Sequence, residues 1–565
     1  MLSLLLFATP LSVAATENAD NLDFFLVTDT HYAPNEDIDP DMETSIENDM
    51  FFYAERLGKM RHESTAIIHA MLNDVASSDA PYLLIAGDLC DKALVEYHEN
   101  MRAMLKEFET TTGKKVFVVP GNHDLTSAEL DDETLVTYNE FEEIYADFGY
   151  NEALNNHDAS ASYTVDLNDE YRLIAIDSIT YGKTSAGISE ETLAWIEQQV
   201  ESAKADGKRL IAMMHHSLLN HFILNTTIVG GYDTISADKL AVKFAEWGIK
   251  YTFTGHLHVN DITSAVTDDG VRVYDVCTGS LAVAPCMYRH VSFADKEVEF
   301  KSHYVTEIDP QYLGGGYTQE QLDYLTSDFV GYSTDYSHYG FYNWVTEFIS
   351  AGKIFPDMDP ESPVYKAIDS ALGLIRDLAV LPLYDNGTEE IDSLEEIGAL
   401  GGAKIPESNY ETVVDVAAVI VHNFYSGEQE FAADSTEVQL AFYFIRSAIP
   451  YIVGRAADLA SLSVGVSALL EKLGLTEAAS SANLTADMSK IMYAETLTAT
   501  VIFSVLTPII ESFTSDSYDP GNFDVVLEGY GVNESFDAEN APITFIQKII
   551  AFFNYLLKVL KNIVA

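Results

Sequence analysis

The chain has 565 residues, 47% of them hydrophobic, and a formal net charge of −58 from 89 acidic and 31 basic side chains. This length allows two or more domains, and this apolar content excludes a disordered chain. So acidic a surface repels nucleic acid, which argues against an enzyme acting on long nucleic acid polymers. The acidity is explained by solubility, or by adaptation to a salty or extracellular setting.

The first predicted element is a secretory signal peptide over residues 1–15. The stretches Leu2–Phe7 and Leu11–Ala15 are apolar, and Val13–Ala15 has the small residues of a cleavage site. We therefore expect a secreted or extracellular protein, either free or associated with the cell surface. The alternative is a mobile apolar tail.

Five short polar motifs follow, each directly after an apolar run typical of a buried strand. The runs are Phe24–Thr28, Tyr82–Ala86, Val116–Val119, Leu210–Met214 and Tyr251–Thr254. The motifs are Asp29-Thr30-His31, Gly87-Asp88, Gly121-Asn122-His123-Asp124, Met214-His215-His216 and Gly255-His256-Leu257-His258. Since open α/β sheets bind ligands at the carboxyl ends of their strands, we expect these side chains at one rim. Taken one at a time, each motif could be a helix cap or a hydrogen-bonded polar residue. This explanation fails for the five motifs together, because helix caps do not require His-x-His or Asn-His-Asp after apolar runs.

The motifs carry carboxylates, imidazoles and an amide. Such ligands suit Mn, Fe, Zn, Co or Mg and not a soft thiolate site. Seven of them are too many for one ion, whereas two divalent ions about 3.5–4 Å apart, bridged by one carboxylate, use them all. Such pairs activate a water and clamp the attacking and leaving oxygens in phosphoester hydrolysis.

Together, the motifs resemble the signature of the calcineurin-like metallophosphoesterase superfamily: D-x-H, G-D-x-x, G-N-H-[DE], a lone His after a strand, and G-H-x-H. The resemblance, which extends to secreted bacterial members, covers residues 22–305. It implies a metal-dependent phosphodiesterase or phosphatase with a four-layer αββα sandwich. It also implies the ligands: Asp29, His31 and His258 for the first metal, Asn122, His215 and His256 for the second, and Asp88 bridging both.

The resemblance further implies that His123 faces the substrate phosphate, and that Asp124 orients His123 by accepting its other ring proton. A tyrosine supplies the colour of the purple acid phosphatases. Asp91 stands in its place here, which argues against a charge-transfer Fe(III) site.

Further candidates for substrate contacts are His216, His221 and Arg61. The two histidines follow the fourth strand, and Arg61 ends a long acidic and aromatic insertion from Tyr32 that is typical of a lid or binding loop. Lys59, Arg61 and His62 either bind a phosphate or leaving group, or start a helix on a solvated face. The three cysteines, Cys90, Cys277 and Cys286, are expected to be free.

The fold class predicted for the catalytic region is α/β. Amphipathic helices are expected between the strands, at Ser64–Asn73, Leu94–Thr110, Asn139–Phe148, Glu190–Ala205 and Ala237–Trp247. Further strands are expected at Arg172–Ile176, Val271–Val276 and Tyr288–Phe293.

Residues 306–540 are predicted to form an all-helical C-terminal domain. Its apolar stretches are Pro363–Val380, Asn409–Tyr425, Glu437–Leu473 and Lys490–Phe513. Internal charges or short uncharged lengths favour buried helices over membrane spans. Residues 543–565, with three Lys and no acidic residue, are predicted to form a separate amphipathic helix. This helix either lies in a membrane interface or docks on the helical domain.

Two function classes stay open. The first is a secreted binuclear phosphoesterase that uses a metal-activated water on phosphodiesters or phosphomonoesters of a small or lipid-like substrate. The second is a catalytically silent binding module at the cell surface that keeps the same fold. The complete ligand set favours the enzyme.

Overall fold

The computed structural model describes residues 21–35, 56–125, 135–180, 186–221, 237–268, 270–294, 296–348, 360–361, 365–366, 369, 373, 376–387, 392–400, 403–427, 431, 435–455 and 525–530. The predicted signal peptide, most of the insertion and the helix at 543–565 lie outside these residues.

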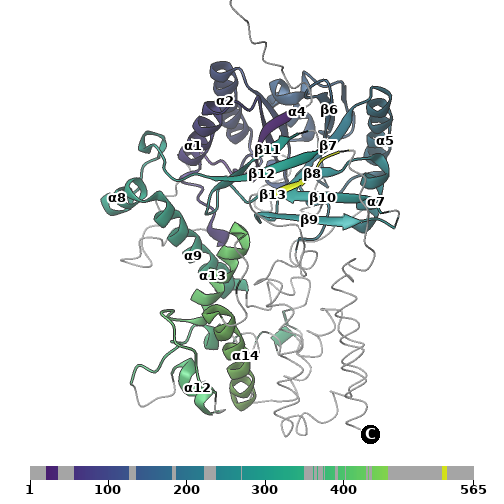
Figure 1. The fold of residues 1–565 in the computed structure, drawn as a ribbon. Coiled ribbons are helices and arrows are strands. Elements are labelled where there is room, and N and C mark those ends of the chain that lie inside the picture. Colours follow the sequence, from purple (N-terminus) through teal and green to yellow (C-terminus); the bar gives the residue numbers. More distant parts are fainter. Residues whose placement is uncertain are drawn as a thin grey trace, which may run out of the picture.

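Two β-sheets form the centre of the catalytic region (Figure 1). The six-stranded sheet has the order β13 (Val525–Glu528), β12 (Glu297–Tyr304), β11 (Met287–Phe293), β1 (Leu22–Val27), β2 (Tyr82–Ala86) and β3 (Lys115–Val119). Strands β1, β2 and β3 are parallel, and the other pairs are antiparallel. The seven-stranded sheet has the order β4 (Asn155–Asn156), β5 (Tyr163–Asp166), β6 (Tyr171–Ile176), β7 (Arg209–Met214), β8 (Tyr251–Thr254), β10 (Arg272–Cys277) and β9 (Asp261–Val266). Its strands β6, β7, β8 and β10 are parallel.

Helices cover the outer faces of both sheets. Figure 1 shows α1 (Ser64–Ser77) and α2 (Val95–Thr112) on one side, and α5 (Glu190–Ala205) and α7 (Ala237–Trp247) on the other. The short helices α3 (Asn122–Leu125), α4 (Tyr138–Ile144) and η4 (Ala146–Tyr150) follow β3. This arrangement confirms the predicted αββα sandwich.

The apolar pattern of β6 explains why the layers stack. Leu173 and Ala175 pack in the core shared with the first sheet, whereas Ile174 and Ile176 pack against α5 and α7. Side chains alternate across a strand, so a continuous apolar run is buried on both faces. Between the sheets, the rings of Phe24 and Phe253 meet edge to face at 5.2 Å.

The C-terminal region is mainly helical in its described parts. It contains η5 (Pro310–Tyr312), α8 (Gln319–Ser327), α9 (Phe329–Phe348), α12 (Leu394–Leu400), α13 (Val413–Ser426) and α14 (Thr436–Arg455). None of the helices within the described ranges is long and apolar enough to cross a membrane.

One element differs from the all-helical expectation for residues 306–540. Residues 525–528 form β13, which pairs antiparallel with β12 at the edge of the first sheet. The segment is rich in β-branched valine, and pairing satisfies the backbone groups that the edge strand would otherwise expose.

Candidate metal centre

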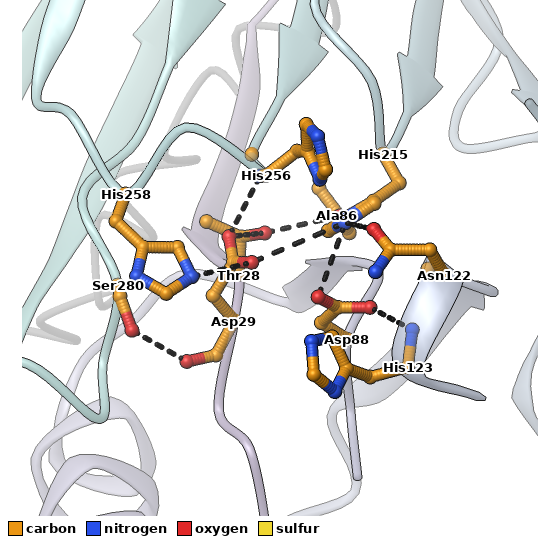
Figure 2. Close-up of polar contacts among 12 residues, drawn as sticks. Thr28, Asp29, Ala86, Asp88, Asn122, His123, His215, His256, His258 and Ser280 are labelled. Carbon is orange, nitrogen blue, oxygen red and sulfur yellow. Dashed lines mark hydrogen bonds and ion pairs between the residues drawn. The ribbon is translucent and has the colours of Figure 1, made fainter. Parts of the chain in front are cut away.

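All five motifs meet at the carboxyl ends of parallel strands (Figure 2). Asp29 and His31 follow β1, Asp88 follows β2, Asn122 and His123 follow β3, His215 follows β7, and His256 and His258 follow β8. Five of these residues have positive φ, namely Asp29 (51°), His31 (41°), Asp88 (49°), His256 (67°) and His258 (59°). Non-glycine residues seldom adopt this conformation, and such strain concentrates at functional sites.

The first group of ligand atoms joins Asp29, His31 and His258. His258 Nε2 lies 3.2 Å from His31 Nε2 and 3.3 Å from Asp29 Oδ1. Asp29 Oδ1 is buried and makes no hydrogen bond within the described residues. The other oxygen, Oδ2, accepts hydrogen bonds from the His256 N–H and the Thr28 hydroxyl. A buried carboxylate oxygen without a donor, beside two imidazole nitrogens, suits a bound cation.

The second group joins Asp88, Asn122 and His215. His215 Nε2 lies 3.3 Å from Asp88 Oδ2 and 3.2 Å from Asn122 Oδ1. His215 Nδ1 donates to the Ala86 carbonyl at 2.9 Å, so Nε2 keeps its lone pair for a metal. Asp88 Oδ2 also lies 3.8 Å from His31 Nε2, which places this oxygen between the two groups. The ring of His256 lies 5.1 Å from that of His215.

Comparison with known proteins agrees with this geometry. Residues 22–260 match the family described as calcineurin-like phosphoesterase, a range that contains all five motifs. This part of the chain is therefore similar to a calcineurin-like phosphoesterase domain. The fold and the clustered carboxylates and imidazoles indicate a centre for two divalent metal ions.

Among curated proteins, the chain is similar to a probable glycerophosphodiester phosphodiesterase GpdQ from Arcobacter nitrofigilis, with 29% identity over 165 residues. The match takes in 28% of this chain and about half, 52%, of the relative's length. Among solved structures, it is similar to a dimetal phosphatase from Danio rerio, with 11% identity, a TM-score of 0.35 and coverage of 51% of this chain and 97% of that one. A purple acid phosphatase from yellow lupin (Lupinus luteus) shows 10% identity, a TM-score of 0.33 and coverage of 51% and 52%.

Burial and neighbouring charges keep three of the candidate ligands, His31, His256 and Asp88, in metal-binding states. Burial, with Lys59 nearby, lowers the pKa of His31 to about 3, and burial beside His215 lowers the pKa of His256 to about 3. Burial alone raises the pKa of Asp88, but His215 and His123 outweigh it and bring that pKa well below its usual range. Metals bind neutral imidazoles and ionised carboxylates, so these protonation states favour binding.

The partner of His123 differs from the prediction. His123 Nδ1 donates to the main-chain carbonyl of Asp91 at 2.8 Å, not to Asp124. The Asp124 carboxylate instead accepts three backbone N–H groups, from Leu89, Cys90 and Gly121, at 2.8 to 3.1 Å. The prediction that Asp124 orients His123 directly is therefore wrong. Asp124 ties the loop after β2 to the loop after β3, because a short carboxylate in a turn meets backbone donors first.

The three weaker candidates occupy different surroundings. His216 is buried, bonds Ser178 Oγ through Nδ1 at 2.9 Å and lies 4.3 Å from the ring of His256. Arg61 Nη1 donates to Asp91 Oδ2 at 2.9 Å, at the rim of the centre.

His221 is not placed for substrate contact. Its Nδ1 lies 2.5 Å from Asp261 Oδ2 and its Nε2 lies 3.2 Å from Asp275 Oδ2. The Thr254 hydroxyl and the Leu219 N–H also donate to Asp275. Both ring nitrogens lie within ion-pair distance of a buried carboxylate, so His221 is a buried ion-pair residue, which differs from the substrate contact predicted from the sequence.

The structure adds two residues to the site. Lys59 Nζ lies 3.4 Å from His123 Nε2 and 3.5 Å from His31 Nδ1. The ring of Tyr425, on α13, lies 6.2 Å from that of His258. The basic cluster of Lys59, Arg61 and His62 in the sequence could have indicated the role of Lys59, although the start of a helix on a solvated face explained that cluster equally well. Nothing in the sequence around Tyr425 indicates the second.

The three cysteines are free and buried, as predicted. Cys90 lies behind the centre, where Sγ is 3.5 Å from His98 Nδ1 and the Tyr145 hydroxyl is 3.0 Å from that same nitrogen. Burial raises the pKa of Cys90 well above its usual value, so this thiol stays protonated and structural.

Proposed function

We propose that this chain hydrolyses phosphoric esters with two divalent metal ions, such as Mn, Fe or Zn. Asp29, His31 and His258 would hold the first ion, Asn122, His215 and His256 the second, and Asp88 would bridge both. The observation that carries the proposal is the position of Asp88 Oδ2, between His215 Nε2 and His31 Nε2 at 3.3 and 3.8 Å. When bound, such ions supply an activated water and stabilise charge on the phosphate.

His123 is the residue that would act on the phosphate or its leaving group. A carbonyl oxygen can only accept a hydrogen bond, so the contact with Asp91 fixes the proton of neutral His123 on Nδ1. Nε2 is left to face Lys59 and the substrate side of the centre. A histidine held in one orientation, with one nitrogen available, can accept a proton there, and the protonated ring can then donate to a phosphate or leaving-group oxygen.

For the substrate, we propose a phosphodiester that is small or lipid-like, with phosphomonoesters as the second class. The matched curated relative is named a probable glycerophosphodiester phosphodiesterase, which supports the diester. The net charge of −58 supports a small substrate over a nucleic acid polymer, because the protein surface would repel a polyanion.

We also propose that the protein is exported and that cleavage follows Ala15, as the apolar stretch and small residues before it suggest. N-terminal sequencing of mature protein from the native host tests this.

Contact with a membrane through residues 543–565 is tested by co-sedimentation with anionic liposomes, comparing the full chain with one truncated after Ala541. Equal partitioning of the two proteins at low salt would rule out membrane contact and leave a helix docked on the helical domain.

The activity is tested with a panel of aryl phosphate monoesters and diesters, each with Mn, Zn and Fe, alongside elemental analysis. We expect two ions per folded chain and metal-dependent hydrolysis. Asp88→Asn should lose metal and activity, whereas Asp169→Asn, on the exposed surface, should keep both. A folded, metal-saturated protein that hydrolyses none of the esters would instead support the silent binding module.

A further inference from the structure

We infer that Lys59 binds a phosphate oxygen of the substrate, and that helix α9 positions Lys59 for this task. The inference rests on the proposed phosphoesterase function, because it assigns a substrate contact at the same centre. The evidence is the place of the ammonium group, the few acceptors that its three donors have within the described residues, and the way the chain around it is held.

The ammonium group of Lys59 lies on the His123 side of the centre. Nζ is 3.4 Å from His123 Nε2, the nitrogen left without a proton by the bond from Nδ1 to the Asp91 carbonyl. An anion can contact this nitrogen once His123 has taken up a proton there, and the anion then also comes within reach of Lys59. This is where a second positive charge, besides the metals, is most effective on a phosphate.

Lys59 shares the nearby carboxylate of Asp91 with two other partners. The two oxygens of Asp91 are engaged by Arg61 Nη1 at 2.9 Å and by His31 Nδ1 at 3.4 Å. Since a carboxylate only accepts, the proton of His31 lies on Nδ1, so this nitrogen offers Lys59 no lone pair. Within the described part of the chain, the three donors of Lys59 have one acceptor, His123 Nε2.

The backbone around Lys59 is held from both sides. The Tyr336 hydroxyl, on α9, donates to the Lys59 carbonyl at 3.0 Å, and the Met60 N–H donates to the Ala282 carbonyl at 2.8 Å. Gly58 has φ +70°, and a Cβ there would lie 2.7 Å from Ser337 Cα. Such close packing requires glycine and fixes where the next side chain begins.

Residue Leu57 in η2 (Arg56–Gly58) strengthens this point, because its φ of 63° is unusual for a leucine. Strained residues persist where the surrounding contacts over-determine them, commonly at ligand sites. The Ser337 hydroxyl also accepts the Ala284 N–H at 3.2 Å, which ties α9 to the loop between β10 and β11. Helix α9, from outside the matched domain, thereby completes the substrate side of the centre.

The experiment measures binding of inorganic phosphate to the metal-loaded full chain by calorimetry, with elemental analysis of each variant. Lys59→Met keeps the length of the side chain and removes its charge. We expect it to weaken phosphate binding about 10- to 100-fold while retaining two ions, since a hydrogen bond to a charged group is lost. Lys59→Arg should recover most of the affinity. Lys106→Met, on the exposed surface of α2, is the matched control and should bind phosphate normally.

A second pair of variants tests the role of α9. Tyr336→Phe removes the hydroxyl that holds Lys59 and should weaken phosphate binding several-fold without loss of metal. Tyr332→Phe, on the same helix but bonded to Glu63, should not. Unchanged phosphate affinity in Lys59→Met, or loss of an ion in that variant, would overturn the inference. Because phosphate binding is measured directly, a wild-type protein that binds phosphate but hydrolyses no ester would overturn the proposed function and leave the Lys59 contact standing.

Discussion

His31 Nε2 and His258 Nε2 lie 3.2 Å apart, although 227 residues separate them in the chain. His31 carries its proton on Nδ1, beside Asp91, so its Nε2 lone pair points toward His258. Two imidazole nitrogens this close would hold a shared cation, and the buried Asp29 Oδ1 beside them would supply a negative ligand.

Metal should therefore stabilise the folded protein. A ligand that binds only the native state at 100 times its Kd adds about 2.7 kcal/mol per site, so Mn or Zn should raise Tm by several degrees and a chelator should reverse the gain. His258→Ala should show a smaller rise. Differential scanning calorimetry with and without metal measures this, and an identical Tm in both would contradict the prediction.

His123 and Asp88 should separate catalysis from metal binding. His123→Ala is expected to keep two ions and to lose about 10²–10⁴-fold in rate, because only proton transfer or phosphate contact is removed. Asp88→Asn is expected to lose metal, because it weakens the shared ligand. Elemental analysis and initial rates, measured on the same preparations, test whether each variant has lost metal or only activity. An emptied site in His123→Ala with full occupancy in Asp88→Asn would reverse the roles.

Asp124 should act through stability. Asp124→Ala leaves three buried N–H groups without their acceptor, and each such group costs about 1–3 kcal/mol unless water replaces it. We expect a large loss in the free energy of urea unfolding, measured in metal-free protein. The milder Asp124→Asn should keep the bond from His123 to the Asp91 carbonyl, and hence a wild-type pH profile of the rate. A shifted profile in a stably folded Asp124→Asn would restore the original prediction that Asp124 orients His123.

His221 should make stability depend on pH. Although burial opposes it, Asp275 and Asp261 raise the pKa of His221 to about 9, against about 6.5 in the unfolded chain. A raised pKa means that the stabilisation is complete below pH 6.5 and is lost as pH rises through 9. The difference in unfolding free energy between wild type and His221→Gln should fall by about 3 kcal/mol between pH 6.5 and 10. A difference that does not change with pH would contradict this, and the comparison cancels the titration of the metal ligands.

The sequence by itself determined the strands that carry the motifs, the order of the motifs and the chemistry of the ligands. Apolar runs such as Leu210–Met214 encode buried strands through short-range pattern, and parallel strands of one sheet necessarily end on the same side. Asp29 and Asp88, which follow neighbouring strands of one sheet, were therefore predictable neighbours, whereas His215 follows a strand of the second sheet and reaches them through the packing of the two sheets. The family resemblance depends on the same local motifs.

The tertiary structure decided the contacts made by side chains between elements. Local sequence does not encode that Asp124 accepts backbone N–H groups, that Asp261 and Asp275 enclose His221, or that α9 holds the segment of Lys59. Strand β13 likewise forms only because β12 offers it an open edge. These contacts depend on how distant segments pack, and the free energy of burying a polar group is set by the partner that packing brings to it.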